Sequence, residues 1–119
     1  MLKRKIYPKL QEWRSSDHQD CLLVKGARQV GKTYTITQFG KSSYKSFISI
    51  NFIESPQLKS LFEGELSSDH IKKQMTLLIP GIEFINGDTL IFLDEIQESP
   101  NARTALKFLA QDKTIDVIA

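Results

Sequence analysis

Eight consecutive residues have the types and spacing of a phosphate-binding loop. Residues 26–33 read GARQVGKT and match the pattern G-x-x-x-x-G-K-[ST] at Gly26, Gly31, Lys32 and Thr33. In this arrangement successive backbone N–H groups surround phosphate oxygens, the lysine reaches the β- and γ-phosphates, and the Ser or Thr hydroxyl binds Mg²⁺. A chance match in a chain of this composition has a probability of roughly 0.4%, so a glycine-rich turn with a stray lysine is the weaker interpretation.

Two adjacent acids, Asp94 and Glu95, follow an apolar run and could complete such a site. Residues 89–95 read TLIFLDE, so a buried strand would deliver both acids to the carboxyl edge of a sheet, where ligands bind in open α/β sheets. An aspartate there holds the Mg²⁺ shell. Glu95, directed to the opposite side of the strand by its two-residue period, could accept a proton from an attacking water. Alone, the pair could be two solvated acids, but the phosphate loop earlier in the chain favours the metal and catalytic roles.

The pattern does not fix the identities of the other loop residues. The predicted nucleotide-binding site includes the rest of the loop and the residue after it: Ala27, Arg28, Gln29, Val30 and Tyr34. We expect Arg28 and Gln29 to face outward, where Arg28 could assist a phosphate or contact a neighbouring subunit. Lys32 joins Glu95 as a catalytic candidate because it is long enough to reach the terminal phosphates.

Apolar runs bounded by turn residues predict the strands that would carry these residues. Three runs have the composition of strands, and a fourth begins at the end of the chain: 21–26 (CLLVKG), 44–52 (YKSFISINF), 89–95 (TLIFLDE) and 114–119 (TIDVIA). The first run is expected to be buried and precedes the phosphate loop, which is where such a loop needs a strand.

Helical patterns lie between the predicted strands. Helices are expected over 6–16, over 32–39, in a short segment starting at Ser55-Pro56, over 67–81 and over 99–110. The fourth would be capped by Ser68 or Asp69 and would direct Ile71, Met75, Leu78 and Ile79 to the core. The last would direct Ala102, Ala105, Leu106 and Leu109 inward. Strands alternating with helices predict an α/β fold with a mainly parallel sheet.

Length and composition are those of one ordinary globular domain. The chain has 119 residues, of which 40% are hydrophobic and 25% charged, and its net charge of +2 is too small to predict nucleic-acid binding. No apolar run reaches the ~18 residues of a membrane span, and the N-terminus lacks the apolar stretch of a signal peptide. With these features and a single cysteine, Cys21, we expect a cytoplasmic protein.

The two motifs together resemble a known family. GARQVGKT followed by IFLDEIQESPNARTALKFLA, with KRKIYPKLQEW before the loop, is similar to prokaryotic AAA-type P-loop ATPases with a GxRQVGKT loop and an LDE Walker B motif. The resemblance implies an additional-strand P-loop fold of strand order 5-1-4-3-2, with ATP and Mg²⁺ as cofactors. It assigns Lys32 and Thr33 to phosphate and Mg²⁺, and Asp94 and Glu95 to the metal shell and catalysis. Gln97 and Arg103 match residues common after the acidic pair, and neither has an assigned role.

The order of the motifs places the end of the chain inside the fourth strand of that fold. We therefore expect residues 1–119 to be the N-terminal part of one AAA-type ATPase domain, with a helical segment over 1–20 and the P-loop core over 21–119. A further C-terminal domain and self-association are expected beside ATP as partners. Because an arginine finger, worth about 10³–10⁵ in rate, would follow this point, we expect ATP binding with slow Mg²⁺-dependent hydrolysis by water that Glu95 activates.

Two alternative functions stay open. A kinase for a nucleotide or small molecule shares the phosphate loop, but it typically uses lid arginines, and the chain has only four arginines in total. A non-hydrolysing nucleotide-binding switch needs no catalytic acid. The presence of Glu95 beside Asp94 favours water activation over the kinase, whereas the switch, or a fragment that binds no nucleotide, stays open. A GTPase would show an N/T-K-x-D motif, which the sequence lacks.

Overall fold

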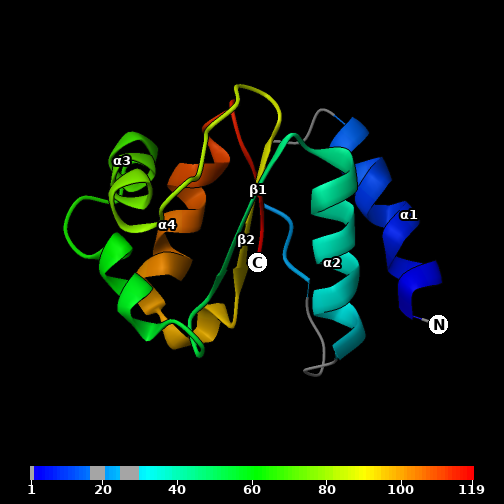
Figure 1. Cartoon of the computed structure of the whole chain (residues 1–119), viewed down its shortest axis with the longest axis horizontal. Helices are drawn as coiled ribbons and strands as arrows, with labels where there is room; N and C mark the ends of the chain where they lie inside the picture. Colours follow the sequence, from blue (N-terminus) through cyan, green and yellow to red (C-terminus); the bar gives the residue numbers. More distant parts are fainter. Residues whose placement is uncertain (1, 17–20, 25–29) are drawn as a thin grey trace.

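A parallel β-sheet lies at the centre of the protein. The computed structural model describes residues 2–16, 21–24 and 30–119. Within these ranges, three parallel strands follow the order β1 (Ser46–Asn51), β2 (Thr89–Asp94) and β3 (Asp116–Ile118). The helices are α1 (Leu2–Ser15), α2 (Val30–Ser43), α3 (Ser68–Leu78) and α4 (Pro100–Ala110), with 3₁₀ helices η1 (Pro56–Phe62) and η2 (Ile96–Glu98). Figure 1 shows α1 and α2 on one side of the sheet and α3 and α4 on the other, which confirms a small α/β fold.

The carboxyl ends of β1 and β2 are level with each other. Their pairing runs from Ser46 opposite Thr89 to Asn51 opposite Asp94. Because the strands are parallel and in register, their last residues meet at one edge of the sheet. In α/β folds this edge is where ligands bind.

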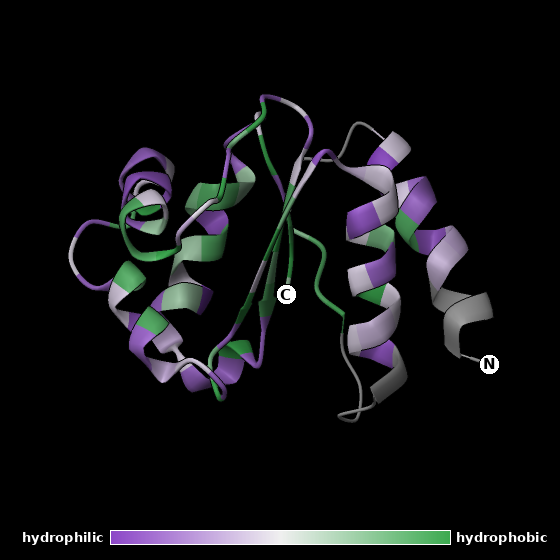
Figure 2. Cartoon of the chain, in the orientation of Figure 1, coloured by the Kyte–Doolittle hydropathy of each residue, from purple (hydrophilic) through white to green (hydrophobic). Residues whose placement is uncertain are grey.

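β2 is buried along its whole length because helices cover both faces of the sheet. Its side chains alternate between two hydrophobic clusters. Ile91 and Leu93 belong to the cluster that includes α3 and α4 residues, and Leu90 and Phe92 to the cluster that includes α1 and α2 residues. A strand buried on both faces has a continuous apolar sequence, and Figure 2 shows hydrophobic residues both in the central strands and on the helices beside them.

Helix α1 packs on α2. Tyr7 of α1 contacts Phe39 of α2 edge to face, with ring centroids 5.8 Å apart. At the other end of α1, Arg14 forms a 2.9 Å ion pair with Asp88 and lies 3.9 Å from the centre of the Tyr44 ring. These contacts attach the N-terminal helix to both α2 and the amino edge of the sheet.

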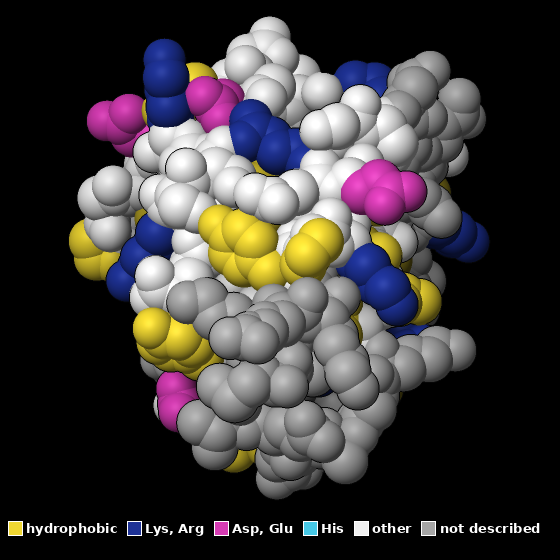
Figure 3. All heavy atoms as spheres, turned by 90° about the vertical axis from the view of Figure 1, so that its right-hand side faces the viewer, with side chains coloured by type: hydrophobic (Ala, Val, Ile, Leu, Met, Phe, Trp, Pro, Cys, Tyr) yellow, Lys and Arg dark blue, Asp and Glu magenta, His cyan; other side chains and the backbone are white. Residues whose placement is uncertain are grey.

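The side of the molecule formed by α1 and α2 carries mixed charge. Figure 3 shows basic and acidic side chains interspersed among the residues described on this face. In the described ranges no helix is both long enough and apolar enough to cross a bilayer.

The segment before the phosphate loop differs from the buried strand that the sequence predicts. In its described part, 21–24, Leu22 forms one parallel bridge with Ile118 of β3, and Leu23 is 41% exposed. Backbone bonds between Leu22, Val24 and the end of β3 hold the segment beside the sheet. It therefore adds a short, partly exposed edge next to β3.

The predicted helices are present, with corrections at their ends. The inward residues predicted for α4 are all buried. The cap of α3 is Ser67, one residue before the predicted candidates. Leu78 is 46% exposed, so its predicted core position is wrong, and the helix ends there. Ile79, predicted on the same face, packs against the core. The short segment after β1 is the 3₁₀ helix η1, and Ser55 makes no side-chain cap bond.

Candidate functional site

The start of α2 meets the end of β2 at the carboxyl edge of the sheet. Thr33, in the first turn of α2, donates its hydroxyl to Oδ2 of Asp94 at 3.1 Å. Asp94 is the last residue of β2 and is only 7% exposed. The structure thus brings together the two residues that the sequence predicts as Mg²⁺ ligands, although they lie 61 residues apart in the chain.

Two further donors surround the Asp94 carboxylate. The side-chain amide of Asn51, level with Asp94 at the end of β1, lies 3.5 Å from Oδ2, and the backbone N–H of Glu95 donates to Oδ1 at 3.0 Å. The other side of the Asn51 amide accepts the backbone N–H groups of Ile53 and Glu54 at 2.9 and 3.0 Å. These bonds hold the buried carboxylate in one orientation, because buried polar atoms keep their hydrogen-bond partners.

Glu95 lies just outside the strand in an uncommon backbone conformation. Its φ of 58° and ψ of 45° are left-handed, and in the described ranges it is the one non-glycine residue with positive φ. β2 ends at Asp94, so the two-residue alternation of a strand does not extend to Glu95. The predicted direction of the Glu95 side chain, to the opposite side of the strand from Asp94, therefore no longer follows. Its Oε1 accepts a 2.6 Å hydrogen bond from the Gln97 amide. Backbone strain of this kind clusters at functional sites.

The phosphate loop is described only in its second part. The predicted residues Gly26, Ala27, Arg28 and Gln29 lie outside the described residues. Val30 and Gly31 begin α2, so the motif leads into a helix N-terminus, where backbone N–H groups lack helical partners and attract anions. Lys32 is half-buried in the first turn, and Tyr34 is 54% exposed.

The oxygen atoms of Thr33 and Asp94 suit a hard cation. Mg²⁺ prefers oxygen ligands, and in nucleotide sites a few protein groups hold it together with phosphate oxygens and water. A hydroxyl and a carboxylate oxygen 3.1 Å apart supply that chemistry. The residues present therefore fit Mg²⁺.

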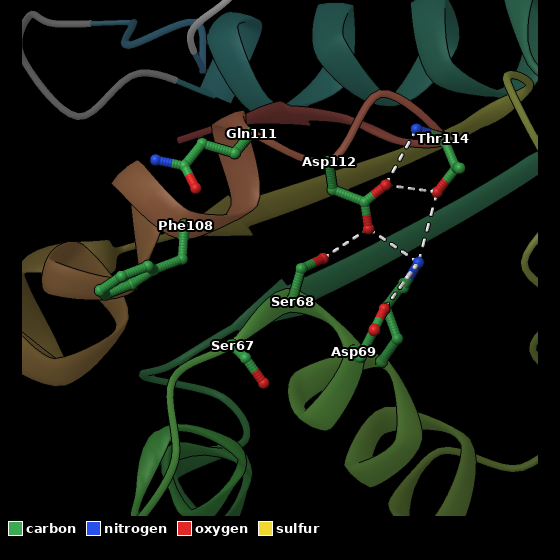
Figure 4. A pocket seen from close by; sticks show the side chains of 8 residues that line it. Ser67, Ser68, Asp69, Phe108, Gln111, Asp112 and Thr114 are labelled. Carbon is green, nitrogen blue, oxygen red and sulfur yellow. Dashed lines mark hydrogen bonds and ion pairs between the residues drawn. The ribbon is translucent and has the colours of Figure 1, made fainter.

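A pocket of about 350 Å³ lies at a different place, between the start of α3 and the end of α4. Figure 4 shows Ser68 and Thr114 turned toward Asp112, which accepts hydrogen bonds from Ser68, Lys72 and Thr114. Asp112 lies before β3, at the amino edge of the sheet, opposite the edge that carries Asp94. None of the predicted site residues that the structure describes, from Val30 to Tyr34 and at Asp94 and Glu95, lines this pocket.

The charges in this pocket stabilise the fold. Burial raises the pKa of Asp112, but hydrogen bonds from Lys72, Ser68 and Thr114 outweigh burial and hold that pKa well below its usual range. The Lys72 ammonium lies 2.7 Å from the Asp112 carboxylate, and both side chains are largely buried. The pair joins α3 to the turn before β3.

The sequence did not identify Asn51 as a residue of the candidate site, and it assigned no role to Gln97. Asn51 ends the run YKSFISINF, and only the register of β1 against β2 shows that it meets Asp94. Gln97 follows Glu95 by two residues, and only the tight turn of η2 brings the two side chains together. A polar residue at the end of a predicted parallel strand is the pattern that could have identified Asn51.

The fold and the site together define a class of protein. A parallel sheet flanked by helices, with a hydroxyl at a helix start facing an acid at a strand end, is the arrangement of P-loop-like nucleotide-binding proteins. Residues 18–119 match the family described as AAA domain. This match covers most of the chain, so the chain belongs to the AAA domain family, which indicates nucleotide binding of the ATPase type. No curated protein and no solved structure matches the chain.

Proposed function

We propose that this chain binds ATP with Mg²⁺ where α2 begins beside the carboxyl edge of β2, and that it hydrolyses the bound ATP. The observation that carries the proposal is the 3.1 Å contact between the Thr33 hydroxyl and Asp94. It joins the last residue of the phosphate-loop motif to the acid of the second motif. Membership of the AAA domain family supports the same function.

Each residue of the proposed site has a physical task. The backbone N–H groups of residues 26–31 would surround the phosphates, and Lys32 would contact the β- and γ-phosphate oxygens. Thr33 and Asp94 would hold Mg²⁺, which neutralises phosphate charge when it is bound. Asn51 keeps the Asp94 carboxylate oriented.

Glu95 is the proposed general base. A carboxylate can accept a proton from a water molecule as the water attacks the γ-phosphate. Glu95 is adjacent to Asp94, and its backbone N–H donates to Asp94 Oδ1, so the two acids occupy one turn at the end of β2. Buried Asp94 thus serves the metal, and half-buried Glu95 serves the water.

Titration with Mg–ATP tests binding. A charge-assisted hydrogen bond contributes about 1.5–3 kcal/mol, so Lys32→Ala should weaken ATP binding about 10-fold or more. The matched control is Lys41→Ala, which removes an exposed lysine from the last turn of the same helix and should leave affinity unchanged. No binding by the folded chain, or equal binding by Lys32→Ala, would contradict the proposal.

Measurement of phosphate release distinguishes ATP hydrolysis from the two alternatives, a nucleotide-binding switch and a kinase. General acid–base catalysis typically contributes about 10²–10⁴-fold, so Glu95→Gln should bind Mg–ATP normally and release phosphate at least about 100-fold more slowly. Undiminished release would remove the role of Glu95. ATP binding by the wild type without release in any condition would identify a switch, and release that depends on an added acceptor would identify a kinase.

A further inference from the structure

The turn after β2 folds back on the side chain of Glu95. η2 spans Ile96–Glu98, and its backbone closes with the N–H of Glu98 donating to the carbonyl of Glu95 at 3.1 Å. Ile96, only 9% exposed, fixes this turn in the hydrophobic cluster that includes α3 and α4. The turn therefore has a defined position relative to the sheet.

Gln97 uses this turn to reach Glu95. Its side-chain amide donates to Oε1 of Glu95 at 2.6 Å. The left-handed backbone of Glu95 starts the turn that makes this contact possible. The strained residue and the hydrogen bond are thus parts of one local arrangement.

The contact limits the freedom of a side chain that otherwise rotates readily. A glutamate has three side-chain torsions, and a catalytic group is effective only when neighbouring contacts lock its rotamer. Glu95 is half-buried, so packing alone encloses only part of it. A donor that holds one carboxylate oxygen fixes the direction of the whole group.

We infer that Gln97 is a positioning residue that orients the Glu95 carboxylate for proton abstraction. The inference rests on the proposed function, because it assigns a task to Gln97 only if Glu95 acts as the base. Gln97 acts through Glu95 and does not itself contact nucleotide. It should therefore affect the rate of the chemical step and not the binding of ATP.

Steady-state ATP hydrolysis by the full chain tests this inference. Misplacement of a catalytic group by about 1 Å costs up to about 100-fold in rate, so Gln97→Ala should lower kcat about 10- to 100-fold. KM and the Kd for Mg–ATP should stay within about twofold, which is the pattern of an interaction needed in the transition state. Gln97→Glu keeps the shape of the side chain but lacks the amide donor, so it should lower kcat at least as much.

A matched control lies in the same turn. Glu98 is exposed and next to Gln97, and Glu98→Gln should leave kcat and KM unchanged. Circular dichroism and thermal melting of each variant establish that it is folded. In a Glu95→Gln background, Gln97→Ala should cause no further loss of rate, because the two residues act as a unit.

The outcomes distinguish the two claims. Wild-type kcat in Gln97→Ala, or a further loss in the Glu95→Gln background, would overturn the role of Gln97 while leaving the proposed function intact. Equal weakening of ATP binding and kcat in Gln97→Ala would show a general structural role and would also overturn the inference. A wild-type chain that neither binds nor hydrolyses Mg–ATP would overturn the proposed function, and the inference with it.

Discussion

At the residue scale, Glu95 combines a chemical task with an unfavourable backbone conformation. A left-handed conformation costs a non-glycine residue about 1–2 kcal/mol, whereas glycine adopts it freely. Glycine also gives the unfolded chain more freedom, which lowers stability by about 0.4–1 kcal/mol. We expect Glu95→Gly to leave the free energy of unfolding unchanged or raise it by up to about 1 kcal/mol, while ATP hydrolysis falls. Urea denaturation and phosphate release measure the two effects.

Glu98→Gly is the control for this substitution. Glu98 lies in the same 3₁₀ turn and does not have positive φ. Glycine there gains no relief of strain and should cost about 0.5–1 kcal/mol. Equal destabilisation by the two glycine variants would show that the Glu95 backbone is not strained.

The residues of the site differ in how far the sequence could predict them. Thr33 and Asp94 were predictable because each lies in a motif whose chemistry requires that residue type at that position. Asn51 was not, because its contact with Asp94 depends on strand register, which local sequence does not specify. The bond from Gln97 to Glu95 was not predictable either, because it depends on a left-handed residue that is not glycine or asparagine.

At the element scale, α2 approaches β1 closely because Gly40 has no side chain. A Cβ at Gly40 would lie closer than 3.0 Å to three ring atoms of Phe47 in β1. Alanine in a helix is favoured over glycine by about 1 kcal/mol, but overpacking typically costs about 1–3 kcal/mol. We expect Gly40→Ala to lower the free energy of unfolding by up to about 2 kcal/mol, measured by urea denaturation.

Removal of the Phe47 ring should reverse the sign of this effect. In a Phe47→Ala background the added methyl group has space, so Gly40→Ala should stabilise by about 1 kcal/mol through helix propensity alone. The difference between the two backgrounds is the coupling energy of the contact. If Gly40→Ala changed the free energy of unfolding by the same amount in the wild type and in Phe47→Ala, Phe47 would be excluded as the reason for glycine at this position.

The elements themselves were predictable where burial and periodicity agree. β2 reads as an uninterrupted apolar run because helices cover both of its faces, and α4 shows an inward stripe that the structure confirms. The segment 21–24 has the same apolar composition as β2 but pairs through one bridge. Apolar composition shows that a segment is able to form a buried strand. Whether it does so depends on the strands that pair with it and the helices that cover it.

At the scale of the whole molecule, the two edges of the sheet have separate tasks. The carboxyl edge carries the acids of the proposed site, and the amino edge carries the buried pair of Lys72 and Asp112 that joins α3 to β3. Because the folded protein holds the pKa of Asp112 below its usual range, the ionised group stabilises the fold. This stabilisation is fully present above the unfolded pKa, about 3.9, and is lost as pH falls through the folded value.

We therefore expect Asp112→Asn to lower the free energy of unfolding at pH 7 by about 1–3 kcal/mol, because it leaves the largely buried Lys72 ammonium without its closest partner. The difference between wild type and variant should shrink as pH falls below about 4, because the unfolded wild-type chain then binds a proton at Asp112 that the folded protein takes up only at lower pH. Asp69→Asn is the matched control. Asp69 lies 3.9 Å from the same ammonium but is 98% exposed, so its loss should change stability by about 0.5 kcal/mol or less at any pH. Urea denaturation between pH 7 and pH 2 measures both variants, and a pH-independent effect of Asp112→Asn would show that its charge does not stabilise the fold.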